Sequence, residues 1–162
     1  MRIHEVAEWL LIADEDVVSA EILNKANNLV NSYYHCSQAV EKYLKCFLVA
    51  NNIKINKDHN ISETLTRCVN CNNSFTVIMK ECDEMSTSIK NLRYPGRIIP
   101  TKENINDAFC LINKIKELES IQNLYKTIID KYGDNWKSVL FKNVANAEIS
   151  ISSINNNDNP NK

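Results

Sequence analysis

Apolar residues recur every three or four positions over most of this 162-residue chain, which is the spacing of amphipathic helices. The first such segment covers 4–27, and the two asparagines at its end suit a turn. The second is capped by Asn31 or Ser32 and runs to about Ala50. Residues 51–60 are polar and favour helix poorly, so we expect a loop there.

Three more helices follow in this pattern. Asn60 has the spacing to cap a short helix over 60–71. A fourth covers 75–92 and ends before a proline and a glycine. Thr101 caps a long fifth helix over 101–132, which a glycine terminates. Its predicted inner stripe is Ile105, Ala108, Phe109, Ile112, Ile115, Leu118, Tyr125 and Ile128.

The pattern predicts an all-α fold, an up-and-down antiparallel bundle of about five helices. Only two glycines and three prolines are present, whereas strand-rich folds use many such turns. We expect one helical domain over residues 1–145. Trp136, Val139, Leu140 and Phe141 suit one last helical turn. Residues 146–162 are rich in Asn and Ser, which predicts a disordered tail.

The composition narrows the functional classes. A net charge of −1 gives no global basic surface, so any nucleic-acid contact must be a local patch. No apolar run is long enough to span a membrane, and the first residues lack the layout of a signal peptide. We therefore expect a cytoplasmic protein with reduced thiols.

The cysteines offer one metal motif. Cys68 and Cys71 form a single C-x-x-C, with Cys82 downstream. Such a pair lacks the second pair of ligands that makes zinc spacing specific. Both residues also fall near one face of a short helix, where thiols pack well. We expect these cysteines to be core or incidental residues rather than zinc ligands, and we expect no metal and no cofactor.

The second helix carries the most informative residues. Its apolar face comprises Ala39, Val40, Tyr43, Leu44, Phe47 and Leu48. Gln38, Glu41, Lys42 and Lys45 form one polar stripe on the other side, with Tyr34 and His35 at its edges. Two ammonium groups, an amide and an imidazole can hold a phosphate. The alternative is a solvated helix face on which Glu41 and Lys45 form an ordinary i,i+4 pair.

Three motifs in this chain resemble those of the HEPN family. The stretch Gln38-Ala-Val-Glu-Lys-Tyr-Leu-Lys45 resembles the Gln-x-x-Glu-Lys-x-x-Lys of the family's second helix. Residues 57–61, Lys-Asp-His-Asn-Ile, are similar to the family's Lys-Thr-His-Asp-Leu. Arg93-Tyr94-Pro95 resembles the Arg-Tyr-Pro that ends its fourth helix. In the first helix, the small and acidic residues at 13, 16 and 20 match as well, and the resemblance covers about residues 5–130.

This resemblance implies a helical bundle that often forms homodimers and associates with nucleotides or RNA. It also implies a possible protein partner, a minimal nucleotidyltransferase encoded beside it in a toxin–antitoxin type of system. Ribonucleases of the family use an Arg, a short polar spacer and a His at the start of the last helix. Here no His follows Arg93 or Arg97, because the chain carries histidines only at positions 4, 35 and 59.

The candidate ligand-binding residues follow from the stripe and the resemblance. They are Gln38, Lys42, Lys45, His59, Arg93, Tyr94 and Arg97. His59 has two interpretations, since it can contact a phosphate together with Lys57 or order its loop by hydrogen bonding. We expect a binding module for nucleotide or RNA. The alternatives are a divergent metal-independent RNase, whose catalytic residues remain unknown, and a structural dimerisation domain.

Overall fold

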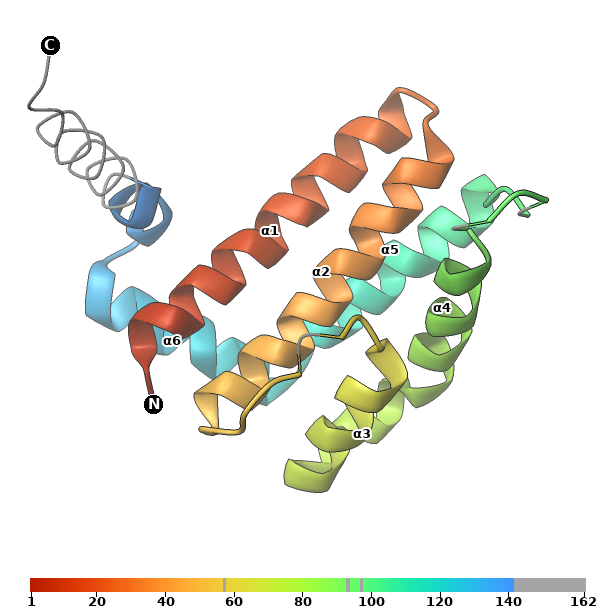
Figure 1. The fold of residues 1–162 in the computed structure, drawn as a ribbon. Helices are drawn as coiled ribbons and strands as arrows, with labels where there is room; N and C mark the ends of the chain where they lie inside the picture. The colour runs from red at the N-terminus through yellow and green to blue at the C-terminus, as the bar shows by residue number, and fades with distance from the viewer. Residues whose placement is uncertain (57, 93, 97, 142–162) are drawn as a thin grey trace, which may run out of the picture. The chain divides into compact units, whose positions relative to one another are not determined.

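The computed structural model describes residues 1–56, 58–92, 94–96 and 98–141. The chain divides into two compact units, Met1–Tyr125 and Lys126–Lys162. The helices are α1 (Ile3–Lys25), α2 (Leu29–Ala50), α3 (Ile61–Cys71), the 3-10 helix η1 (Asn73–Ile78), α4 (Met79–Asn91), α5 (Lys102–Glu117) and α6 (Glu119–Tyr132), as Figure 1 shows. No strand occurs in these ranges. The predicted all-helical bundle is confirmed.

A tight turn makes α1 and α2 an antiparallel hairpin (Figure 1). Asn27 takes a left-handed conformation, with φ of 59°, which asparagine tolerates better than most residues. Asn28 caps α2, and its side-chain oxygen accepts a hydrogen bond from the Asn31 amide at 3.4 Å. The predicted cap at Asn31 or Ser32 is therefore wrong, because both residues lie in the first turn of the helix.

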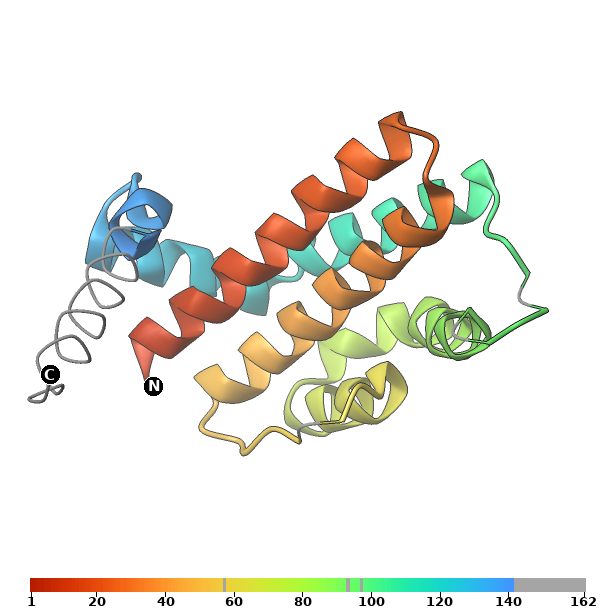
Figure 2. The ribbon, with the colours of Figure 1, turned by 45° about the horizontal axis from the view of Figure 1, so that its top comes forward.

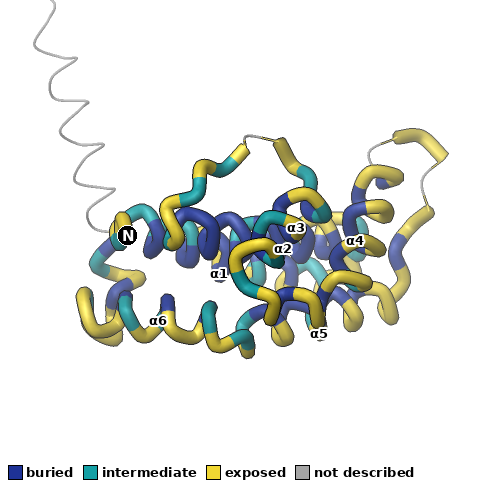
Figure 3. The backbone as a smooth tube through the Cα atoms, turned by 90° about the horizontal axis from the view of Figure 1, so that it is seen from below, coloured by how far each residue is buried: buried dark blue, intermediate teal, exposed yellow. Residues whose placement is uncertain are grey.

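The centre of the first unit is α2, which contacts α1, α3, α4 and α5. Figure 2 shows α1 and α5 running beside it, with α3 and α4 against another side. All six residues predicted for its apolar face are buried, and Figure 3 shows buried positions along most of its length. The Phe47 ring packs on Phe75 of η1 with centroids 4.5 Å apart. This burial fixes which residues of α2 remain at the surface.

The segment predicted as a fourth helix consists of two helices. Asn72 caps η1 by accepting a hydrogen bond from the Ser74 amide at 3.0 Å. This tight helix buries Phe75 and Ile78, and α4 then begins at Met79. By contrast, the predicted cap of the third helix is confirmed, since the Asn60 side chain accepts from the Glu63 amide at 3.3 Å.

The prediction of one long fifth helix is wrong, because the structure has two helices there, α5 and α6, which are separated at Leu118. There ψ is 127°, which is not helical. The Leu118 amide donates to the Ile115 carbonyl at 3.2 Å, and its own carbonyl accepts from the amides of Ile121 and Gln122. One residue thus ends α5 and begins α6. The predicted cap at Thr101 is confirmed, and it forms a full capping box with Asn104.

The C-terminal segment is described as far as residue 141. Gly133 follows α6 with φ of 82°, as expected of a glycine that ends a helix. The predicted last turn is confirmed, since residues 136–141 are helical. The predicted tail, residues 146–162, lies outside the described residues. None of the described helices combines the length and the apolar character that crossing a membrane requires.

Candidate functional site

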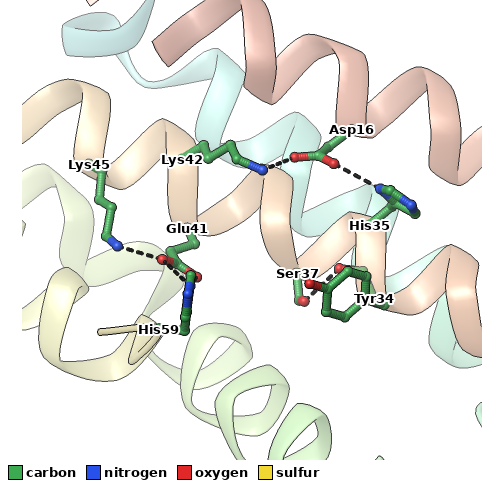
Figure 4. A network of polar contacts seen from close by, with 8 residues as sticks. All are labelled: Asp16, Tyr34, His35, Ser37, Glu41, Lys42, Lys45 and His59. Atoms are coloured by element: carbon green, nitrogen blue, oxygen red, sulfur yellow. Dashed lines mark hydrogen bonds and ion pairs between the residues drawn. The ribbon is translucent and has the colours of Figure 1, made fainter. Parts of the chain in front are cut away.

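Polar side chains of α2 form two charged clusters, both drawn in Figure 4. The first is centred on Asp16 of α1 and comprises Asp16, His35 and Lys42. His35 Nδ1 lies 2.8 Å from Asp16 Oδ1, and the Lys42 ammonium donates to Asp16 Oδ2. Asp16 is buried, both of its carboxylate oxygens have a partner on α2, and the Lys42 ammonium compensates its charge. We call this the Asp16 cluster.

The second, the Glu41 cluster, comprises Glu41, Lys45 and His59. Lys45 Nζ lies 2.6 Å from Glu41 Oε1 and 2.8 Å from the Asp58 carbonyl oxygen, to which it also donates. His59 Nδ1 lies 3.1 and 3.2 Å from the two carboxylate oxygens. The predicted i,i+4 pair is confirmed. Its interpretation as a solvated face is wrong, because the Lys45 and Glu41 side chains are only 6% and 5% exposed.

Helical geometry explains why the two clusters stay separate. Glu41 and Lys45 are one turn apart, whereas His35 and Lys42 are two turns apart and share another side of α2. Glu41 and Lys42 are consecutive, so they point about 100° apart. The Asp16 cluster therefore faces α1, and the Glu41 cluster faces the segment before α3 (Figure 4).

Both histidines are held in the same way, with Nδ1 at a carboxylate. Since the ring nitrogens lie on opposite edges, Nε2 of each is directed away from its carboxylate. The His35 side chain is 32% exposed and that of His59 is 59% exposed. The exposed Tyr34 ring meets the His35 ring edge-on, with centroids 5.7 Å apart. An imidazole oriented in this way can donate to a phosphate oxygen or accept a proton from a hydroxyl.

The predicted site residues divide into groups. Lys42 pairs with His35 through Asp16, and Lys45 pairs with His59 through Glu41. Gln38, one helical turn before Lys42 on α2, is half-buried. For His59, the contact with Glu41 agrees with the interpretation that it orders its loop.

The other predicted site residues belong to the connection between α4 and α5. Tyr94 is 69% exposed there, and no described contact joins it to either cluster. Arg93, Arg97 and Lys57 lie outside the described residues.

Sequence reasoning missed that Asp16 and Glu41 are the centres of the clusters. The available signals were the acidic position in the first helix and the i,i+4 spacing of Glu41 and Lys45.

A third carboxylate, Asp14, lies inside the bundle. It accepts hydrogen bonds from the hydroxyls of Tyr43 and Tyr125, each at 2.6 Å. Lys116 Nζ lies 3.5 Å from Asp14 and between 5.8 and 5.9 Å from the two ring centroids. Burial raises the pKa of both tyrosines well above the ordinary range, and Asp14 raises it further. Both phenols therefore remain protonated donors, so this group, the Asp14 cluster, is a structural centre of the first unit.

The cysteines do not act as one set. Cys68 is buried, with its sulfur 3.5 Å from the Leu44 carbonyl oxygen, whereas Cys71 is exposed. Burial raises the pKa of the Cys36 and Cys82 thiols to about 12. In the described part of the chain, no three His, Cys, Asp or Glu side chains are grouped as metal ligands would be.

Comparison with known proteins identifies the family. The family model described as HEPN domain matches residues 6–124, a stretch that contains most of α1, all of α2 to α5, both charged clusters and three members of the Asp14 cluster. No curated protein and no solved structure matches the chain. The family match spans well over half of the sequence. The chain therefore belongs to the HEPN family of helical domains, which points to a nucleotide- or RNA-related function.

Proposed function

We propose that this protein is a nucleotide- or RNA-binding HEPN module that holds its ligand on the exposed side of α2. The observation that carries this proposal is the pair of imidazoles, His35 and His59, each oriented by a buried carboxylate. The exposed Tyr34 ring lies beside His35, and Gln38 is half-buried on the same helix. Oriented donors next to an aromatic ring suit a ligand that combines a phosphate with a base.

The charges on this side favour a small ligand. Lys42 is balanced by Asp16, and Lys45 by Glu41, so the histidines supply the remaining donors. A protein that coats a long polyanion needs many uncompensated cations. The net charge of −1 also disfavours such coating. We therefore infer that the ligand is a single nucleotide or a few unpaired nucleotides of RNA.

The same imidazoles support a second candidate function, metal-independent RNA cleavage. A carboxylate-held His can remove the proton of a 2′-hydroxyl group. This function ranks below binding because no His follows Arg93 or Arg97. RNases of the family are expected to have a His there.

We further propose assembly as a homodimer. The side chains of Ile12, Val18 and Ile22 are exposed on α1, and an isologous interface would cover such an apolar surface in both copies. A second partner, a minimal nucleotidyltransferase in a toxin–antitoxin type of system, follows from the family resemblance. The genes beside this one test that part directly.

Replacement of the histidines tests the binding site. In the double variant His35→Ala/His59→Ala, affinity for a short labelled RNA or a nucleotide should fall by about 1–3 kcal/mol, the usual loss for charge-assisted contacts. Fluorescence anisotropy and calorimetry measure this loss. On sequence grounds Arg93→Ala should cause a loss of about the same 1–3 kcal/mol, because an Arg is well suited to hold a phosphate.

His4→Ala is the matched control. His4 is also an exposed imidazole beside a carboxylate, with Nε2 lying 3.6 Å from Glu8, but it is at the start of α1. Its replacement should leave affinity unchanged. If the double variant bound as tightly as the wild type, or if His4→Ala weakened binding equally, α2 would not be the binding surface.

A further inference from the structure

A cleft between α4 and α5 is separate from the charged clusters. It consists of two adjoining cavities of about 220 and 230 Å³, which share Tyr33, Ser88 and Asn104 in their lining. Tyr33 comes from α2 and is almost fully buried, so it forms the floor. Cavities of this size are smaller than sites for drug-sized ligands, and they suit one or two side chains.

One half of the cleft is acidic. Among the residues that the structure describes, its lining includes Glu81, Glu84 and Asp107 and a single cation, Lys114. Lys114 Nζ lies 2.5 Å from Glu81 Oε1, so this lysine already compensates Glu81. Glu84 has only a distant surface partner, Lys80 at 3.9 Å, and both side chains are largely exposed. Among the described residues, Asp107 has no ion-pair partner and Glu84 has only this exposed one, so the described lining of this half carries net negative charge.

The floor of the cleft is the hydroxyl group of Tyr33, which stays protonated. Burial raises the pKa of Tyr33, a hydrogen bond with Ser88 lowers it in part, and the charges of Glu84 and Asp107 raise it. Its phenol therefore stays neutral. A phosphate would be repelled by the carboxylates, which separates this cleft from the proposed nucleotide site on α2.

The other half is mainly apolar and lies at the connection between the helices. Leu92, Ile98 and Pro100 line it, together with the amides of Asn91 and Asn104. Ile98 is 83% exposed, although isoleucine is among the residues most often buried. An apolar wall beside the carboxylates of Glu84 and Asp107 is complementary to a chain segment with a basic and an apolar side chain next to each other.

We propose that this cleft is a docking site for an arginine-bearing segment of a partner protein. The guanidinium group lies at Glu84 and Asp107, and the neighbouring apolar side chain packs on Leu92, Ile98 and Pro100. Arginine suits the acidic half better than lysine, because its planar group has five donors and is weakly hydrated. It can also pair with a carboxylate through two hydrogen bonds at once.

A titration followed by NMR tests this site. The probe is the capped dipeptide Arg-Leu, and its control contains citrulline, a neutral analogue of arginine. We expect Arg-Leu to shift the amide signals of Tyr33, Ser88 and Asn104 saturably. Citrulline-Leu should bind at least about ten-fold more weakly, the loss for one charge-assisted contact.

Variants locate the charge that is responsible. Glu84→Gln/Asp107→Asn should weaken Arg-Leu binding at least about ten-fold. Asp83→Asn is the matched control, because Asp83 is exposed on the same helix but does not line the cleft, and it should bind normally. The same titration repeated on His35→Ala/His59→Ala should give wild-type affinity.

Three results would overturn the docking site. They are the absence of shifts around the cleft up to the solubility limit of Arg-Leu, equal binding of the citrulline probe, and unchanged binding by the charge-neutralised variant. None of them involves a nucleotide. A failure of this site would therefore leave the proposed function of α2 standing, and a failure of nucleotide binding would leave the docking site standing.

Discussion

Glu41→Gln tests whether charge holds the Glu41 cluster together. The substitution keeps the shape of the side chain but leaves the Lys45 ammonium buried, at 6% exposure, without its anionic partner. Removal of one member of a buried ion pair costs about 3–5 kcal/mol. The Asp58 carbonyl still accepts from Lys45 at 2.8 Å, so we expect the lower end, about 3 kcal/mol. In a domain of this size that lowers Tm by roughly 10 °C.

The double variant Glu41→Gln/Lys45→Met separates charge from packing. It removes the uncompensated ammonium and keeps an unbranched apolar side chain, so most of the lost free energy of unfolding should return. Urea unfolding followed by circular dichroism measures both values.

An exposed pair with the same i,i+4 spacing provides the control. Lys80 and Glu84 of α4 are 3.9 Å apart with both side chains largely exposed, so Glu84→Gln should cost less than about 0.5 kcal/mol. If Glu41→Gln cost no more than this control, or if the double variant were as unstable as the single one, the electrostatic account of the cluster would be wrong.

Four further outcomes are expected. Only Cys71 and Cys110 should react with a thiol reagent before unfolding, because the other cysteines are buried; a third reactive thiol would contradict this. In urea unfolding, Tyr125→Phe should lower the free energy of unfolding by about 1–2 kcal/mol, because Asp14 loses a hydrogen-bond donor. A variant as stable as the wild type would show that this hydrogen bond does not contribute to stability. Wild-type protein should leave RNA intact, and cleavage that disappears in His35→Ala or His59→Ala would place the RNase function first. Sedimentation should give twice the 18.6 kDa chain mass, and a monomer at micromolar concentration would argue against the homodimer.

Local signals predicted the helices well, because caps and periodicity act over a few residues. Asn60 and Thr101 cap helices where their side chains can reach amides three residues ahead. The break at Leu118 had no such signal. Leucine favours helix, and the apolar spacing continues on both sides of it, so the sequence reads as one helix.

Long-range contacts explain what sequence reasoning missed at the candidate site. The sequence predicted one polar stripe on α2, whereas its charged residues fall into two clusters, and the burial of Glu41 and Lys45 depends on the segment before α3, where the Asp58 carbonyl accepts from Lys45. The contact of Asp16 with His35 and Lys42 likewise joins residues 19 and 26 positions apart. Helical spacing gives the faces of each helix, but it does not give the partner that covers a face.

The Asp14 cluster constrains the order in which the chain can fold during synthesis. Tyr43 can reach Asp14 as soon as α2 has been made, but the bond from Tyr125 closes a separation of 111 residues. A nascent chain that ends before this tyrosine lacks one of the donors to a carboxylate in the interior. Contacts this distant in sequence form late, after their loop-closure entropy has been overcome. The α1–α2 hairpin can therefore assemble on the ribosome, but Asp14 gains its hydrogen bond from Tyr125 only when α6 has emerged.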